Sequence, residues 1–227
     1  MVDHETPRGP SRDERILRHI ARYRVSTREA ISKRFFEGGN PGNVIQRLLR
    51  EGRIVSRRGL PDNARFYQIA PKEAIARGVP LNRAKPFGPT ALATHLTLLW
   101  YCALHPDGID RGRMERSDLR EFFEERAPTG DHCVEWTEPT RIVNPLVPRL
   151  TTPPRKVIAR VAERAETSAA IPRVRSLSAS GQYAVAVLAC SDVQIERYKE
   201  ALHRHERTRP IPVRVDFSGG VPAMVGA

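Results

Sequence analysis

Cysteine is scarce in this sequence, and no long apolar run is present. The three cysteines, Cys102, Cys133 and Cys190, are far apart and form no CxxC pair, which argues against a disulfide framework or a zinc site. No stretch reaches the roughly 18 consecutive apolar residues that a membrane helix needs. The opening residues, MVDHETPRGPSRDER, are polar, so we expect no secretory signal, no membrane partner and a cytoplasmic location.

Acidic residues are too few to balance the basic ones, and the imbalance is local. The chain of 227 residues has a formal net charge of +12. Residues 1–90 contain 19 Lys and Arg but 9 Asp and Glu, whereas residues 91–227 contain 19 and 17. Segregated positive charge predicts a polyanion-binding module joined to a nearly neutral one. A general solubility charge is the alternative, but solubility does not require segregation.

The basic part of the chain predicts three helices followed by a β-hairpin. SRDERILRHIARYR and STREAISKRFF each begin with an S-x-x-E capping box, Ser11 with Glu14 and Ser26 with Glu29. Asn40 is the expected N-cap of a third helix that runs to about Arg50. RIVSRR and ARFYQIA, separated by GLPDN, read as two strands and a turn. This order is the plan of a winged helix-turn-helix domain.

The third helix has two faces of different character. Ile45, Leu48 and Leu49, with Val44 at their edge, form an apolar stripe that is expected to pack on the first two helices. The opposite stripe contains side chains that suit base edges and phosphates: Asn43, Gln46, Arg47 and Arg50. No acidic residue interrupts this stripe before Glu51. We therefore predict a DNA-reading face, with a solvated basic face as the alternative.

Further predicted DNA-binding residues surround the third helix. Arginines on or beside the hairpin are expected to reach the DNA backbone or a flanking minor groove: Arg53, Arg57, Arg58 and Arg65. Thr27, Arg28 and Asn40, near the starts of the second and third helices, complete the predicted set. Arg57 and Arg58, taken alone, fit an exposed strand end equally well.

The rest of the chain predicts a second domain, which makes the fold class α+β. We expect a flexible N-terminus at 1–10, a winged helix at 11–80, a linker at 81–90, an α/β domain at 91–217 and a flexible tail at 218–227. TALATHLTLLWYCALHP predicts a buried helix, and PPRKVIARVAERAETSA predicts another helix. YAVAVLAC and IPVRVDF, separated by the helix SDVQIERYKEALHRHE, predict two parallel strands.

These segments together resemble the replication-relaxation family of bacterial plasmid, phage and mobile-element proteins. The resemblance is best over residues 14–78, and in the second half it depends mainly on element order. It implies a winged helix joined to a restriction-endonuclease-like core, and DNA binding in the control of replication, transfer or local transcription. A MarR-like or other winged-helix repressor remains an alternative.

A nuclease of that core fold would need motifs that this sequence lacks. Its metal site requires an Asp on one strand and (Asp/Glu)-x-Lys on the next, so that the carboxylates hold Mg²⁺ and the lysine orients the water. None of the five lysines follows an acidic residue at that spacing. Glu135 is the one strand carboxylate placed to be a remnant, and an ordinary exposed strand charge explains it better. We therefore infer a degenerate restriction-endonuclease-like core that binds DNA or dimerises, and we expect no catalytic residues, no metal and no cofactor.

Three functional hypotheses follow from these patterns. The first is a non-enzymatic, homodimeric protein that binds double-stranded DNA as a repressor or as a replication or transfer regulator. The second is a metal-dependent nuclease with a relocated lysine. The third is a protein-interaction module of a DNA-associated complex. No small-molecule ligand is identifiable from the sequence, and a nucleoid-associated location accompanies the first hypothesis.

Overall fold

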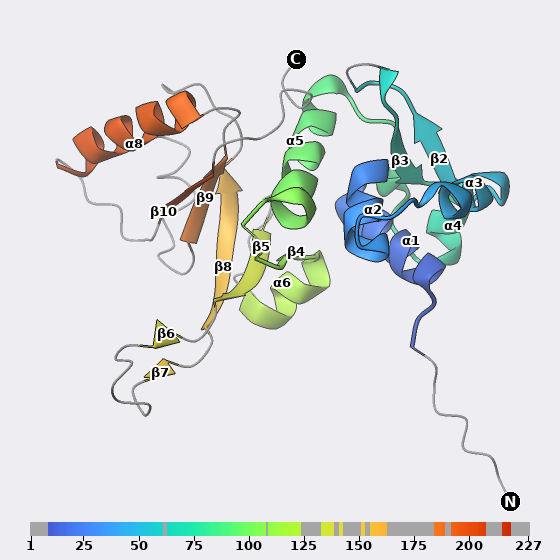
Figure 1. The fold of residues 1–227 in the computed structure, drawn as a ribbon, viewed down its shortest axis with the longest axis horizontal. Helices are drawn as coiled ribbons and strands as arrows, with labels where there is room; N and C mark the ends of the chain where they lie inside the picture. The colour runs from blue at the N-terminus through green and yellow to red at the C-terminus, as the bar shows by residue number, and fades with distance from the viewer. Residues whose placement is uncertain are drawn as a thin grey trace, which may run out of the picture. The chain divides into compact units, whose positions relative to one another are not determined.

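The computed structural model is mixed α+β, and the chain divides into two compact units, Met1–Leu99 and Trp100–Ala227 (Figure 1). The structure describes residues 9–60, 63–107, 109–123, 133–138, 141–142, 151–152, 155–162, 184–188, 192–207 and 215–218. The expected flexible ends lie almost wholly outside these ranges, as do Cys190 and part of the GLPDN turn.

The first unit has the order helix, strand, helix, helix, hairpin. Its three-stranded sheet has the order β1-β3-β2, with β3 antiparallel to both neighbours. The elements are α1 (Arg12–Tyr23), β1 (Ser26–Thr27), α2 (Arg28–Phe36), α3 (Gly42–Arg50), β2 (Ile54–Arg57), β3 (Phe66–Ile69), α4 (Pro71–Ala76), η2 (Leu81–Arg83) and α5 (Pro89–Leu99). The three helices and the hairpin therefore form as the sequence predicts, and the short strand β1 was not predicted.

One apolar core holds the helices and the hairpin of the first unit together. Ile16 and Ile20 of α1, Ile31 of α2, Leu48 of α3 and Ile69 of β3 belong to the same cluster, and each has no exposed surface. Burying side chains of this size contributes about 1.5–3 kcal/mol each relative to leaving them in water. The core fixes which side of α3 faces inward, and therefore which side faces solvent.

The predicted helix starts are close to the observed ones. Ser11 caps α1, since its Oγ accepts a hydrogen bond from the Glu14 amide at 3.3 Å. The predicted capping box of Ser26 and Glu29 was wrong: the cap of α2 is Thr27, whose Oγ1 accepts from the Ala30 amide, while the Ser26 hydroxyl is hydrogen bonded to His19. Helix α3 begins at Gly42, one residue later than expected, so its N-cap is Pro41 and not Asn40 as predicted. Asn40 Oδ1 nevertheless accepts a hydrogen bond from the Gly42 amide at 2.8 Å.

The boundary between the units lies after the predicted linker, not within it. Ala84 is a buried member of the first unit's core. Phe87 packs its ring near Phe66 of β3, and the Arg24 guanidinium stacks over Phe87. Residues 81–90 are therefore attached to the first unit, which ends at Leu99. The predicted apolar helix is present as α5 and as the π-helical turn Trp100–Leu104 that continues it.

The second unit is built on a five-stranded sheet with the order β10-β9-β8-β5-β4. Its elements are β4 (Arg111–Arg113), α6 (Arg116–Phe123), β5 (Cys133–Glu138), β6 (Arg141–Ile142), β7 (Thr151–Thr152), β8 (Arg155–Ala162), β9 (Ala184–Leu188), α8 (Asp192–Glu206) and β10 (Val215–Ser218). Strands β9 and β10 pair in parallel, as predicted, and α8 lies between them in the chain. Strand β4 was not predicted.

The prediction of a helix in PPRKVIARVAERAETSA was wrong over residues 155–162. These residues form β8, which pairs antiparallel with β5 and parallel with β9. Val157 and Val161 are four residues apart, a spacing that fits one helix face but also fits alternate positions of a strand. Because β-branched residues favour strands and β8 is paired along both edges, tertiary pairing decides the ambiguity.

None of the helices in the described part of the chain is both long and apolar enough to span a membrane.

Candidate nucleic-acid interface

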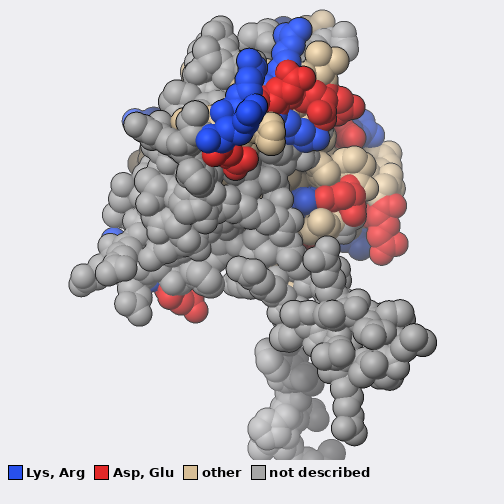
Figure 2. All heavy atoms as spheres, turned by 90° about the vertical axis from the view of Figure 1, so that its left-hand side faces the viewer, with Lys and Arg blue, Asp and Glu red and all other residues tan. Residues whose placement is uncertain are grey.

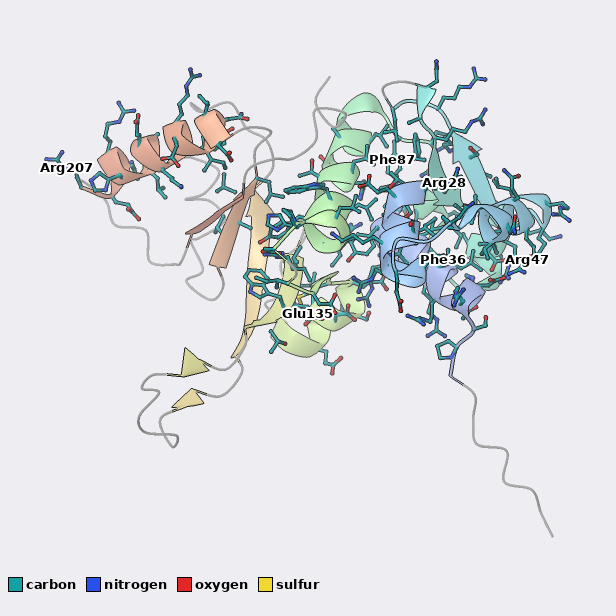
Figure 3. The ribbon with its side chains drawn as sticks, in the orientation of Figure 1. Arg28, Phe36, Arg47, Phe87, Glu135 and Arg207 are labelled. Carbon is teal, nitrogen blue, oxygen red and sulfur yellow. The ribbon has the colours of Figure 1, made fainter. Side chains whose placement is uncertain are left out.

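Helix α3 presents its polar stripe to solvent. Ile45 and Leu48 are buried with 3% and 0% exposure, whereas all four residues of the polar stripe are exposed: Asn43, Gln46, Arg47 and Arg50. Figure 3 shows Arg47 on α3. Leu49 is half-buried against the core, at the edge of the apolar stripe. The exposed stripe therefore offers amide and guanidinium donors from one face of one helix.

The start of α3 is tied to α2 by a small polar cluster. Arg28 Nη2 donates to Asn40 Oδ1 at 2.8 Å, and the same oxygen accepts from the Gly42 amide. Arg28 and Asn40 are both exposed. Two of the predicted DNA-binding residues are thus in contact, and Asn40 fixes the entry of the chain into α3. Thr27, a third predicted residue, uses its Oγ1 to accept from the Ala30 amide at 3.2 Å.

The hairpin carries three of the predicted arginines in different environments. Arg58 is exposed at the end of β2, and Arg65 is exposed and contacts Ser56 Oγ at 3.4 Å. Arg57 is half-buried, and its Nε has no hydrogen-bond partner among the described residues. Gly59, with φ of +130°, follows Arg58, and this backbone conformation favours glycine. Arg58 and Arg65 are therefore the hairpin cations most available to an anionic partner.

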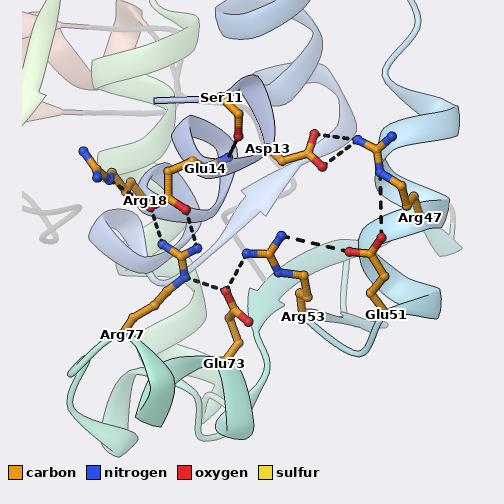
Figure 4. Close-up of polar contacts among 9 residues, drawn as sticks. All are labelled: Ser11, Asp13, Glu14, Arg18, Arg47, Glu51, Arg53, Glu73 and Arg77. Carbon is orange, nitrogen blue, oxygen red and sulfur yellow. Dashed lines mark hydrogen bonds and ion pairs between the residues drawn. The ribbon is translucent and has the colours of Figure 1, made fainter. Parts of the chain in front are cut away.

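Arg47 and Arg53 belong to a continuous ion-pair network that joins α1, α3 and α4 (Figure 4). Arg47 Nη2 donates to both carboxylate oxygens of Asp13, at 2.7 and 2.5 Å. Arg53 Nη2 donates to Glu73 Oε1 at 2.9 Å. Along the chain of contacts, acidic and basic residues alternate: Asp13, Arg47, Glu51, Arg53, Glu73, Arg77, Glu14 and Arg18. Its four arginines and four carboxylates cancel in charge.

Arg77 is the centre of the less exposed half of this network. Its Nη1 and Nη2 donate to the two oxygens of Glu14, each at 2.6 Å, and its Nε donates to Glu73. The hydrogen bonds from Arg77 lower the pKa of Glu14 to about 2. Burial alone would raise the pKa of Glu73, but the hydrogen bonds from Arg53 and Arg77 outweigh it, so this pKa is lowered. Helix α4 is thereby fastened to α1.

Sequence reasoning missed the acidic residue that meets the polar stripe of α3. Asp13 is 34 positions before Arg47 in the chain, and no local pattern connects the two. The absence of acidic residues within the stripe was correctly read from the sequence, but the fold supplies one from α1. As a result, Arg50 is the stripe's arginine without an ion pair to any residue in the described ranges.

The second unit lacks the excess of basic residues that the first unit has, because residues 91–227 contain 19 basic and 17 acidic residues. Helix α8 carries Glu196, Arg197, Lys199 and Glu200 within two turns, and Figure 2 shows acidic and basic side chains next to each other on the face that includes α8. Lys199 Nζ pairs with Glu196 at 2.7 Å. Glu135 is half-buried in β5 opposite Gly112. Within the described ranges, no group of three His, Cys, Asp or Glu residues is arranged to hold a metal.

Comparisons of the chain with protein-family models, with curated proteins and with solved structures find no match.

Proposed function

We propose that this protein binds double-stranded DNA through a winged helix-turn-helix domain in its first unit, with α3 in the major groove and the β2–β3 hairpin as the wing. The observation that carries the proposal is the two-sided character of α3. Its apolar side is held in the core, and its solvent side presents Asn43, Gln46 and Arg50 together. Amides recognise adenine edges, and arginine recognises guanine edges or phosphate.

The distribution of charge supports the same proposal. The first 90 residues hold 19 basic and 9 acidic residues, and exposed arginines lie on the hairpin beside α3 as well as on α3 itself. Each arginine that meets a phosphate adds affinity by releasing condensed counterions, without adding sequence preference. In sequence-specific DNA binding, phosphate contacts position the protein and base contacts select the sequence. The arginines of the hairpin and the polar stripe of α3 supply side chains suited to these two tasks.

The biological role that we propose is regulation of transcription, replication or transfer of a plasmid, phage or other mobile element. The winged-helix arrangement and the resemblance to the replication-relaxation family support this role. We also propose a homodimer, because two copies can place two recognition helices in half-sites about one helical turn apart. In this proposal the protein regulates without catalysing a reaction, and the second unit serves dimerisation or auxiliary DNA contacts.

Fluorescence anisotropy with a labelled duplex from the region upstream of the protein's own gene tests the DNA-binding proposal. We expect Arg50→Ala and Arg58→Ala each to weaken binding by about fivefold at physiological salt. This follows because each lost phosphate contact reduces the logarithmic salt slope by about 0.9. The matched control is Arg204→Ala, which removes one exposed arginine from α8, a helix of mixed charge that the proposal does not place on DNA.

The control separates a local contact from a general loss of positive charge. If the three variants weaken binding equally, the assignment to α3 and the hairpin is wrong. If the wild-type protein does not bind the duplex at low salt, DNA binding itself is wrong. Capture of an acidic protein partner would then support the interaction-module hypothesis.

A further inference from the structure

Arg47 is the one residue of the predicted base-reading stripe whose charge is already matched inside the protein. Asp13 from α1 holds Nη2 through both of its oxygens, and Glu51 lies 3.9 Å from Nε. The side chain of Arg47 is nevertheless 49% exposed. No hydrogen bond or ion pair involves its Nη1 within the described residues, and Figure 4 shows this nitrogen unbonded beside the pair.

The carboxylates around Arg47 change which DNA groups it can meet. A phosphate that approached this guanidinium would come close to Asp13 and Glu51, and like charges repel at these distances. The O6 and N7 acceptors of a guanine edge carry no full charge, so the same repulsion opposes them much less. Arg50, one turn further along α3, forms no ion pair with Asp13, Glu51 or another carboxylate in the described ranges and remains suited to phosphate.

We infer that Asp13 prevents Arg47 from binding phosphates and reserves it for the edge of a base. Asp13 is therefore a specificity-determining residue that acts through Arg47. It lowers affinity for DNA of any sequence and so improves discrimination. This inference rests on the proposed function, because it assumes that α3 faces DNA. It assigns Arg47 and Arg50, which the sequence places in the same stripe, to different tasks.

The salt dependence of binding to a labelled duplex of random sequence tests this inference. Asp13→Asn keeps the shape of the side chain and removes its charge, which frees Arg47 to meet a phosphate. We expect the affinity of Asp13→Asn for random duplex to rise about fivefold at physiological salt. The salt slope should become steeper by about 0.9, the value for one further phosphate contact.

A double-mutant cycle shows whether the effect passes through Arg47. In an Arg47→Ala background, Asp13→Asn should change neither the affinity nor the salt slope. Asp192→Asn, which removes an exposed carboxylate from the first turn of α8, should leave both quantities at the wild-type values. Retained helical circular dichroism confirms that each variant is folded. Arg47→Ala removes the Asp13–Arg47 ion pair from the other side, so the role of the pair can be tested with two different variants.

The outcomes separate this inference from the proposed function. If wild-type protein binds random duplex and Asp13→Asn leaves the slope unchanged, the role of Asp13 is wrong and DNA binding stands. The inference is also overturned if the increase persists in the Arg47→Ala background, since the effect would then be a general charge effect. If wild-type protein binds no duplex at any salt concentration, the proposed function fails, and the inference fails with it.

Discussion

At the scale of single residues, His19 is a titratable group buried within the first unit. Its side chain is buried in α1, and its Nε2 lies 3.1 Å from Ser26 Oγ. Its ring also packs against Tyr23 and Phe35. Burial, together with the charge of Arg34, lowers the pKa of His19 to about 3 from its ordinary value of 6.5. The folded unit therefore favours the neutral imidazole.

We predict that the first unit loses stability as the pH falls from about 6.5 toward 3. In that window the unfolded chain binds a proton at His19 that the folded chain does not, so unfolding becomes more favourable by up to about 1.4 kcal/mol per pH unit. Amide hydrogen exchange of α1 in the full chain measures the free energy of unfolding of this unit, once the intrinsic exchange rates are corrected for pH.

The matched comparison for this prediction is His19→Gln against His203→Gln. We expect His19→Gln to flatten the pH dependence and the exposed His203→Gln to leave it unchanged. An unaltered pH profile in His19→Gln would show that His19 is not the group responsible.

Some features of single residues could be predicted from the sequence, and others could not. The inward and outward sides of α3 were predictable, because helical period alone separates Ile45 and Leu48 from Gln46 and Arg50. The Asp13–Arg47 pair was not predictable, because it joins two helices through tertiary packing. The DNA-reading role of the outward side stays a prediction.

At the scale of elements, the order of helices and the hairpin in the first unit followed from caps and apolar periodicity. The second unit was harder to read, since β8 has a pattern that fits either a helix or a strand. The decisive information is the pairing of its backbone with β5 on one edge and β9 on the other. Such pairing joins residues far apart in the sequence, so a local pattern cannot reveal it.

We predict that Ala159→Pro destabilises the second unit by at least about 2 kcal/mol. Ala159 is paired with Val134 of β5 and with Ala184 of β9, and proline cannot donate a ladder hydrogen bond. Urea unfolding followed by tryptophan fluorescence reports this unit, because Trp100 and Trp136 both belong to it.

The control is Asp192→Pro, at the first position of α8, where proline is tolerated because that amide has no intrahelical acceptor. We expect this variant to unfold close to the wild-type midpoint. Equal midpoints for Ala159→Pro and the wild type would contradict the placement of residue 159 inside a two-sided ladder.

At the scale of the whole molecule, positive charge is unequally divided between the two units. The first unit holds nearly all of the excess positive charge, whereas α8 of the second unit carries acidic and basic residues side by side. The sequence predicted this asymmetry from composition alone. The position of the boundary was not predictable, because residues 81–90 look like a linker but Ala84 and Phe87 pack on the first unit's core and sheet.

The central claim is that α3 and the β2–β3 hairpin form the surface that meets DNA. The most direct measurement is an NMR titration of the ¹⁵N-labelled full chain with an unlabelled duplex, in which every backbone amide reports its own environment. We predict that the largest shifts fall in α3 and in the hairpin near Arg58 and Arg65, and that they diminish as salt is raised. Shifts concentrated in α8, or no salt-sensitive shifts at all, would contradict the account.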